Sequence, residues 1–406
     1  MSSRLLDLLD LNELSYIQST DASVALNTQQ RKFYPEKTEY KSPEVIRFVI
    51  QGRQFLDMKK TSVSMVVGLS NTSNFNAGQS FLNFINRVRV IAPNGKDISD
   101  VRKANLQAYY SNKLYRSSNW EISVGEPTTR LNAATLPGGD YPIYIPLRLL
   151  SPFFDNDQLL PPEITENMIV ELYLEKDAIT TPDTGVTYSI SNPELITQMT
   201  LMNDSITKAI HMMSNKQLVY EYEDLVHTEH FSSNASSDIR FHLTHSLTNA
   251  LEVFTSVRKA AEARADNANS FQGLEVKMHE DESENDQLLY RVGDVFLPQQ
   301  RILGGTGIYD YLLRNRDIME DNKVTNFSYN QGDFELDANG VGAIYFSNLR
   351  RSKLFNTSGR EISNQNSLML EIKYHNGGTS TNVIADMFCR HVARVVIRKG
   401  MIEVER

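Results

Sequence analysis

The stretch IYIPLRLLSPFFDNDQLLP, residues 143–161, changes character several times within a short length. It begins as an alternating β-type run, passes Pro146, continues as a leucine-rich segment and ends in Leu-Leu-Pro after Phe153 and Phe154. The alternation predicts a strand at its start, and the prolines predict that a loop or short helix follows through Phe154. A second run with strand character, residues 168–174, comes shortly afterwards.

Similar short runs recur along the whole chain. They are rich in β-branched and aromatic residues and are separated by turn signals such as Pro93-Asn94-Gly95. Many short strands with turns between them predict an all-β sandwich or barrel architecture. A helix is also expected over residues 99–114. The further predicted strands are residues 45–50, 61–68, 88–91, 195–202, 239–245, 251–257, 287–292, 343–346, 368–374 and 393–397.

The two halves of the chain resemble each other at one large offset. Residues 143–145 match residues 344–346, and Phe154 matches Phe355 further on. Residues 168–172 align with residues 368–372, which brings Glu171 onto Glu371. The two strand matches occur in the same order and with nearly the same gap between them. We therefore expect a duplicated β-sandwich, although apolar alternation is common to all β-sandwiches and chance similarity is the alternative.

Composition limits the functions that the chain can have. It has 406 residues, enough for two domains, and its hydrophobic (40%) and charged (22%) fractions are those of an ordinary globular protein. The net charge of −9 argues against a specific nucleic-acid ligand, because no general basic surface is available to phosphates. The single cysteine, Cys389, excludes an internal disulfide framework. The N-terminus lacks the pattern of a secretory signal, so the chain is not expected to be secreted.

The N-terminal segment differs from the rest. Residues 4–14 predict a short amphipathic helix with one leucine stripe, and the polar residues 18–44 predict an extended arm and not a packed element. The predicted division is an arm at 1–40, a first jelly roll at 41–205 and a second at 206–406. The stripe, for which we predict a role in assembly, consists of Leu5, Leu8, Leu9, Leu11 and Leu14.

Residues 143–161 resemble the "strand, Pro-Leu, short helix, Phe-Phe, Leu-Leu-Pro" segment of double jelly-roll major capsid proteins, the lineage of tailless icosahedral DNA viruses. The strand at 168–174 follows where that family has its next strand. Residues 290–300, which end in Pro-Gln-Gln, resemble a second segment of the family. The likeness is greatest to capsid proteins of Polinton-like viruses and virophages. It covers 143–174 and 290–300 directly, and the architecture of nearly the whole chain.

The resemblance implies two tandem jelly rolls and a structural, non-enzymatic protein. Three copies would form a pseudo-hexagonal homotrimer that tiles an icosahedral shell. The partners implied are other copies of the chain, penton proteins and minor capsid proteins, with contact to an internal membrane left open. The place implied is the virion, after synthesis in the host cytoplasm or nucleus. The alternatives are a tandem β-sandwich spike that binds a glycan or receptor, and a jelly-roll glycoside hydrolase with two facing carboxylates.

Three motifs have residue types that can form chemical sites. His227 with His230, and His242 with His245, have a spacing that can suit a metal, but residues three apart on a strand point to opposite faces. The glycine-rich residues 304–307 lack the lysine of a phosphate-binding loop, and the acidic run 279–286 lacks a calcium-binding pattern. Ordinary histidines and solvated loops are the favoured interpretations.

Cys389 and His391 are predicted to share one face of a strand, but nothing around them indicates an activated nucleophile. A small buried hydrophobe is the simpler interpretation of Cys389. No catalytic, cofactor-binding or metal-binding residue is therefore assigned, and no cofactor is expected.

Overall fold

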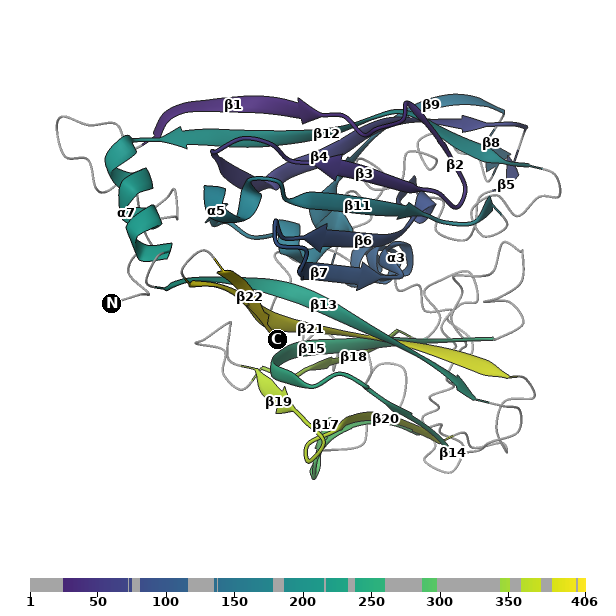
Figure 1. Cartoon of the computed structure of the whole chain (residues 1–406). Helices are drawn as coiled ribbons and strands as arrows, with labels where there is room; N and C mark the ends of the chain where they lie inside the picture. Colours follow the sequence, from purple (N-terminus) through teal and green to yellow (C-terminus); the bar gives the residue numbers. More distant parts are fainter. Residues whose placement is uncertain are drawn as a thin grey trace.

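The fold is all-β. In the computed structural model, the described residues are 25–71, 73–74, 81–115, 135–136, 138–177, 186–214, 217–232, 238–259, 287–297, 344–350, 359–373, 382–398 and 401–406. The main strands of the N-terminal half form two sheets that face each other, and those of the C-terminal half form two more (Figure 1). Residues 73–74 and 135–136 form a separate two-stranded pair.

The larger sheet of the N-terminal half has the order β1-β12-β4-β10, with β2 paired to β12 and β9 to β4. The smaller sheet has the order β3-β11-β6-β7. Their bounds are β1 Ala25–Phe33, β2 Glu39–Lys41, β3 Val45–Val49, β4 Phe55–Leu69, β6 Ile85–Ile91, β7 Asp97–Arg102, β9 Gly139–Pro146, β10 Leu159–Leu160, β11 Ile169–Leu174 and β12 Tyr188–Met202.

The C-terminal half repeats this arrangement. Its larger sheet has the order β13-β21-β15-β18, with β19 paired to β15 and β22 to β21, and its smaller sheet has the order β14-β20-β16-β17. The bounds are β13 Leu218–Ser232, β14 Asp238–His242, β15 Leu247–Lys259, β16 Gln287–Val292, β17 Val295–Leu297, β18 Ile344–Asn348, β19 Arg360–Ile362, β20 Leu368–Lys373, β21 Val383–Arg398 and β22 Met401–Glu405.

These strand orders define two jelly rolls. Eight main strands of each half can be lettered B to I in chain order. One sheet then reads B-I-D-G, which is β1-β12-β4-β9 in the first half and β13-β21-β15-β18 in the second. The other reads C-H-E-F, which is β3-β11-β6-β7 and β14-β20-β16-β17. We call them the first and second BIDG sheets and the first and second CHEF sheets. The predicted double jelly-roll fold is confirmed.

The sequence matches between the halves join equivalent strands. Residues 143–145 and 344–346 lie in the two G strands, β9 and β18, and residues 169–172 and 368–372 lie in the two H strands, β11 and β20. Phe355 lies outside the described residues.

Short helices connect the strands. The predicted segment 99–114 is partly wrong, because its start belongs to β7 and only Ala104–Tyr115 forms a helix, α3. Helix α7, Asp204–Ser214, links the last strand of the first roll to β13 (Figure 1). The remaining elements are β5 Ser73–Asn74, β8 Thr135–Leu136, η2 Phe81–Phe84, η5 Leu147–Leu149, η6 Pro152–Phe154 and α5 Pro162–Thr165.

One prediction about the N-terminal region is wrong. Residues 25–33 and 39–41 were expected to belong to an extended arm, but they form β1 and β2, which pair with β12. An outer strand of a sheet is held by its backbone hydrogen bonds, so it can form without apolar alternation. Most of the side chains of β1 are exposed, which is why its sequence resembles that of a loop.

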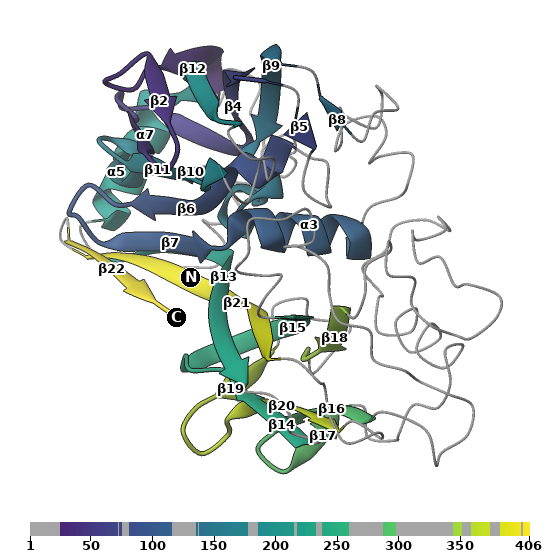
Figure 2. The same ribbon diagram turned by 90° about the vertical axis from the view of Figure 1, so that its right-hand side faces the viewer.

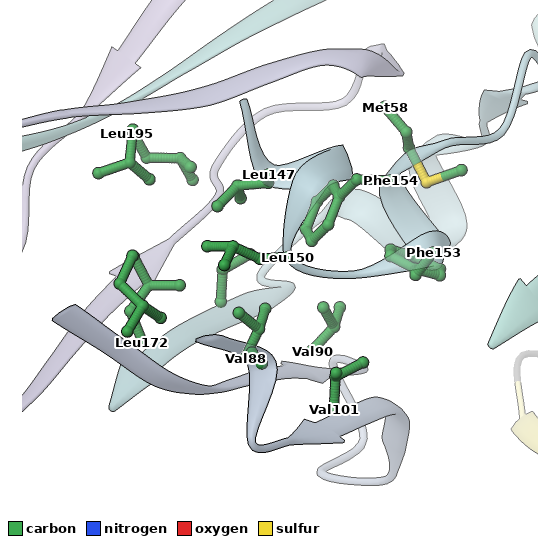
Figure 3. Close-up of a cluster of buried hydrophobic side chains, with 14 of the residues drawn as sticks. Met58, Val88, Val90, Val101, Leu147, Leu150, Phe153, Phe154, Leu172 and Leu195 are labelled. Atoms are coloured by element: carbon green, nitrogen blue, oxygen red, sulfur yellow. The ribbon is translucent and has the colours of Figure 1, made fainter. Parts of the chain in front are cut away.

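The segment of residues 143–161 reaches into the core of the first roll. Leu147, Leu150, Phe153 and Phe154 are completely buried, and Figure 3 shows them packed among side chains from both sheets. Side chains of this segment therefore fill the space between the two sheets of the first roll. Its partners include Met58, Val88, Val90, Val101, Leu172 and Leu195.

Candidate functional site

In the described structure, apolar, aromatic and polar contacts occur together where the two rolls meet. The largest hydrophobic cluster begins in the first roll and continues into β13, β15, β21 and β22 of the second. Strand β7 lies beside β13, and η6 also packs on β13 (Figure 1). The two rolls therefore share one core. The second-roll members include Tyr220, Tyr222, Leu225, Phe254, Phe388, Ala393, Val395, Ile397 and Ile402.

Tyr222 is the central aromatic residue of this contact. Its ring meets Phe153 edge-on, with centroids 5.1 Å apart, and its hydroxyl donates a hydrogen bond of 2.7 Å to the carbonyl of Ile98. Beside it, the Ser99 hydroxyl donates to the buried carboxylate of Asp224 at 2.7 Å. Phe153 comes from the segment 143–161, so this segment also fixes the second roll.

We call this contact between the two rolls the seam, and hydrogen bonds extend it on both sides. The Asn94 side-chain amide, in the turn between β6 and β7, donates to the carbonyl of Ile402 at 2.9 Å. The Asn156 amide donates to the carbonyl of Glu221 at 3.0 Å. Because these bonds end on backbone atoms of β22 and β13, they fix the position of the strands themselves.

A buried charge cluster lies on the face of the second BIDG sheet that contacts Tyr110 of α3. Figure 2 shows the position of α3 relative to β15 and β21. Arg258 on β15 forms an ion pair with Asp386 on β21, and His227 on β13 lies 2.8 Å from the other carboxylate oxygen. The side chains of Arg258, Asp386 and His227 are only 6%, 0% and 7% exposed. Nearby, the hydroxyls of Ser256 and Tyr110 of α3 are 2.5 Å apart, so hydrogen bonding joins the rolls here too.

Electrostatics in this cluster favours the charged carboxylate. Burial alone would raise the pKa of Asp386, but Arg258 and His227 outweigh it, and the net shift of its pKa is downward. Burial would lower the pKa of Arg258, but Asp386 raises it above its usual value. The pair is therefore a buried ion pair at neutral pH.

A second buried carboxylate, Glu252, lies on the same sheet face. It is completely buried, with Arg390 Nε 3.1 Å from one of its oxygens and Arg350 Nη1 3.5 Å from the other. A charge inside an apolar strand is stable only with such partners. Sequence analysis missed both clusters. The available signal was an acidic residue inside an otherwise apolar run, as at Asp386 in residues 384–389 and Glu252 in residues 250–254.

The outer face of the first CHEF sheet carries a ladder of ion pairs. Glu171 contacts Arg47 of β3 and Arg89 of β6, and Arg87 binds Asp100 of β7. The second CHEF sheet repeats one rung, because Glu371 forms an ion pair with Arg240 of β14 at 3.2 Å. Glu171 and Glu371 are the pair that the internal repeat aligned, so they keep the same contact in both rolls.

The histidines of the two H-x-x-H pairs are not brought together as one site. His227 faces Asp386, whereas His230 lies on the other side of β13 and contacts Phe241 and the carbonyl of His242. His245 lies 3.3 Å from the hydroxyl of Thr228. Within the described ranges, no three His, Cys, Asp or Glu side chains are placed to hold a metal ion.

Cys389 and His391 are both completely buried on β21. Burial raises the pKa of the Cys389 thiol, so the thiol stays protonated and packs as a hydrophobe. The runs 279–286 and 304–307 lie outside the described residues, as do Leu5, Leu8, Leu9, Leu11 and Leu14. In the part of the chain that is described, no helix is long and apolar enough to span a bilayer.

Two jelly rolls in one chain with a common core define a double jelly-roll protein. No protein family description matches the sequence, and no curated protein is similar to it. Solved structures do share the fold. The Faustovirus major capsid protein matches with a TM-score of 0.61 at 9% identity, over 98% of this chain and 98% of that chain.

Two other viral structures give the same result. The PBCV-1 virus capsid matches with a TM-score of 0.59 at 9% identity, over 96% of this chain and 99% of that chain. The Sputnik virophage structure matches with a TM-score of 0.57 at 11% identity, over 95% of this chain and 89% of that chain. At such low identities the likeness establishes the shared fold, and it extends over almost the entire length of both chains.

Proposed function

We propose that this chain is the major capsid protein of a tailless icosahedral virus with a DNA genome. The observation that carries the proposal is the pair of equivalent jelly rolls fixed to each other by one core, in a fold shared with viral capsid proteins. A subunit whose two rolls share one core is suited to be a building block. Its buried ion pairs join neighbouring strands of the second BIDG sheet. The role is therefore structural and not catalytic, and its place is the virion shell.

The assembly unit is a homotrimer. Three chains of two similar rolls give an outline with six similar corners, which can tile a flat facet. We expect sedimentation at micromolar concentration to give three times the 46.2 kDa chain mass. A permanent assembly buries on the order of 2,000 Å² or more, which is enough to keep the trimer intact at that concentration. A monomer under these conditions would contradict the proposal.

The chain divides into an N-terminal arm, a first roll that ends near residue 205 and a second roll from 206 onward. Helix α7 lies at this division and follows β12 directly. Because β1 starts at residue 25 and pairs with β12, the arm is limited to the residues before it. The shared core implies that the two rolls are units of architecture and do not fold independently.

The arm acts in assembly on the inner side of the shell. Its leucine stripe, Leu5, Leu8, Leu9, Leu11 and Leu14, forms one apolar side of a predicted helix that is too short to be stable alone in water. A neighbouring capsomer or a minor shell protein is the proposed docking partner, and the acidic residues beside the stripe disfavour an anionic bilayer.

Deleting residues 1–20 tests this role. We expect the truncated protein to form intact trimers that fail to close a shell or hold it poorly, because the deleted leucines contribute roughly 1.5–3 kcal/mol each when buried. Particle yield, diameter and melting temperature are the measurements. If the truncated protein assembles into particles like those of the full chain, the arm has no role in assembly.

The further partners of the shell are penton proteins at its vertices and minor capsid proteins beneath it, with contact to an internal membrane as a further proposal. The chain is made in the host cytoplasm or nucleus. Support for these partners is the geometry of a closed icosahedral shell, in which a trimer with a hexagonal outline does not fit a five-fold vertex.

A further inference from the structure

His391 lies where two hydrophobic clusters meet. Its side chain is completely buried, and the alternation of β21 places it on the same face as Cys389 and Ala393. Cys389 belongs to the cluster that lies within the second roll, whereas Ala393 belongs to the cluster that both rolls share. The imidazole is therefore a polar group between two apolar regions.

The contacts of the imidazole ring suit its neutral form. Nδ1 lies 3.3 Å from the carbonyl oxygen of Val392, and because a carbonyl can only accept a hydrogen bond, Nδ1 carries the proton. Nε2 is buried too, and it has no hydrogen-bond partner among the described residues. A second proton would occupy Nε2 and would add a positive charge and an unpaired donor to an apolar environment.

The charged and titratable groups that face His391 come from three other elements. Asp224 is directly opposite on β13, Arg406 follows β22 and His245 follows β14, whereas the residue opposite on β15 is an alanine. Asp224 is the anion of this set, and both of its oxygens are engaged. One accepts a hydrogen bond of 2.7 Å from Ser99 of the first roll, and the other lies 3.9 Å from Nε of Arg406.

Burial has the largest effect on the titration of His391. It lowers the pKa of the imidazole, whereas Asp224 and the carbonyl of Val392 raise that pKa and Arg406 lowers it further. The net shift of the pKa is downward from the ordinary value of about 6.5. The folded chain therefore favours the neutral imidazole, as the contacts of the ring also indicate.

We propose that His391 makes the seam sensitive to acid, because protonating this buried ring opposes the packing that holds the two rolls together. The ring lies beside Asp224, whose bond to Ser99 joins the second roll to the first. It also borders the shared cluster at Ala393. The inference concerns a contact within one chain, so it stands or fails independently of the proposed function.

The direction of the pH dependence follows from the unfolded chain. An unfolded histidine binds a proton below about pH 6.5, whereas folded His391 binds one only at a lower pH. The contribution of the neutral ring to stability is therefore complete above about pH 6.5, and it is lost as the pH falls from that value to the lowered pKa. Within this window, one pH unit raises the unfolding constant by at most about tenfold.

The variant His391→Asn removes the titrating ring and keeps a polar side chain. Urea unfolding of the full-length wild type and of H391N, at about pH 7.5 and about pH 5.5, gives an unfolding constant for each protein. We expect acid to raise the constant of the wild type about three- to tenfold more than that of H391N. The control H211N replaces a histidine of α7 whose side chain is 68% exposed, and it should respond to acid as the wild type does. An equal response of H391N and the wild type would overturn the proposal.

Hydrogen exchange in β22 tests whether the effect of acid lies at the seam. This strand is bonded to the first roll through Asn94 and the carbonyl of Ile402, and it leads into Arg406. After correction for the intrinsic effect of pH, we expect the amides of residues 401–405 to lose more protection in acid in the wild type than in H391N. Equal loss in both proteins, or no loss in the wild type, would show that His391 does not control the seam.

A measurement on the wild type makes the test independent of whether H391N folds. Deuterium exchange at the imidazole C2 carbon, followed by mass spectrometry, titrates each histidine separately. The midpoint of His391 should lie below about pH 6.5 in the folded protein and move up to that value in denaturant. A midpoint at or above about pH 6.5 in the folded protein would show that the fold accommodates the charged ring, and it would overturn the proposal.

Discussion

Replacing Asp386 by Ala should lower the free energy of unfolding by about 3–5 kcal/mol. The substitution leaves the guanidinium of Arg258 without its carboxylate at a position where only 6% of that side chain is exposed. It also removes the oxygen that His227 contacts at 2.8 Å. A buried charge that has lost its partner cannot recover the solvation that it lost on folding, so the cost is large. Urea unfolding of the wild type and of D386A measures the difference.

The matched control is Asp294→Ala. Asp294 also forms an ion pair with an arginine, Arg291, at 3.2 Å, but its side chain is fully exposed to solvent. An exposed pair of this kind contributes about 0–1 kcal/mol, so D294A should unfold almost like the wild type. A D386A variant that loses no more stability than D294A would contradict the interpretation of the cluster as a buried ion pair.

The Asp386 cluster also predicts a pH dependence. The pKa of Asp386 is lower in the folded protein than its ordinary value of about 3.9, so its carboxylate stabilises the fold above that value. The contribution is lost as the pH falls through the lowered pKa. The stability difference between the wild type and Asp386→Asn, which cannot ionise, should therefore shrink as the pH is lowered from about 6 to about 2. A difference that stays constant or grows over this range would contradict the prediction.

Replacing Tyr222 by Ala should cost about 3–5 kcal/mol of stability, because it leaves a cavity against Phe153 at the centre of the shared core. Tyr222→Phe keeps the ring and removes only the bond to the carbonyl of Ile98, so we expect a smaller loss of about 0.5–1.5 kcal/mol. The exposed tyrosine Tyr34, which is 65% accessible, provides the control Tyr34→Ala, with an expected change within about 0.5 kcal/mol.

The Tyr222 series also tests whether the two rolls depend on each other. Because they share one hydrophobic cluster, both should unfold in a single cooperative transition that Y222A shifts as a whole. Two separate transitions, with only one of them displaced by Y222A, would show that the rolls are independently stable and that the seam is weak.

The parts of the fold that local sequence pattern specifies could be predicted. Strand β11 alternates buried and partly buried residues, and β9 ends at Pro146, where the sequence indicates that a loop or short helix follows. The aligned glutamates, Glu171 and Glu371, each form an ion pair with an arginine on the neighbouring C strand. The alternation of β11 and the end of β9 depend on residues that are close together in the sequence, whereas the arginine partners of the two glutamates come from other strands.

The seam could not be predicted in the same way. Arg258 and Asp386 are 128 positions apart, and Tyr222 and Ile98 are 124 apart, so only the complete strand order brings them together. Strand β1 was missed for a related reason, because its partner β12 supplies the hydrogen bonds that its own polar sequence does not signal.

Negative-stain electron microscopy of the purified full-length protein tests the central claim most directly, since it shows both the copy number and the outline of the assembly. We expect uniform particles of three chains with a hexagonal outline, because two equivalent rolls per chain give six similar corners. Single two-lobed molecules, or trimers with a plainly three-cornered outline, would contradict the assignment of this chain as the building block of an icosahedral shell.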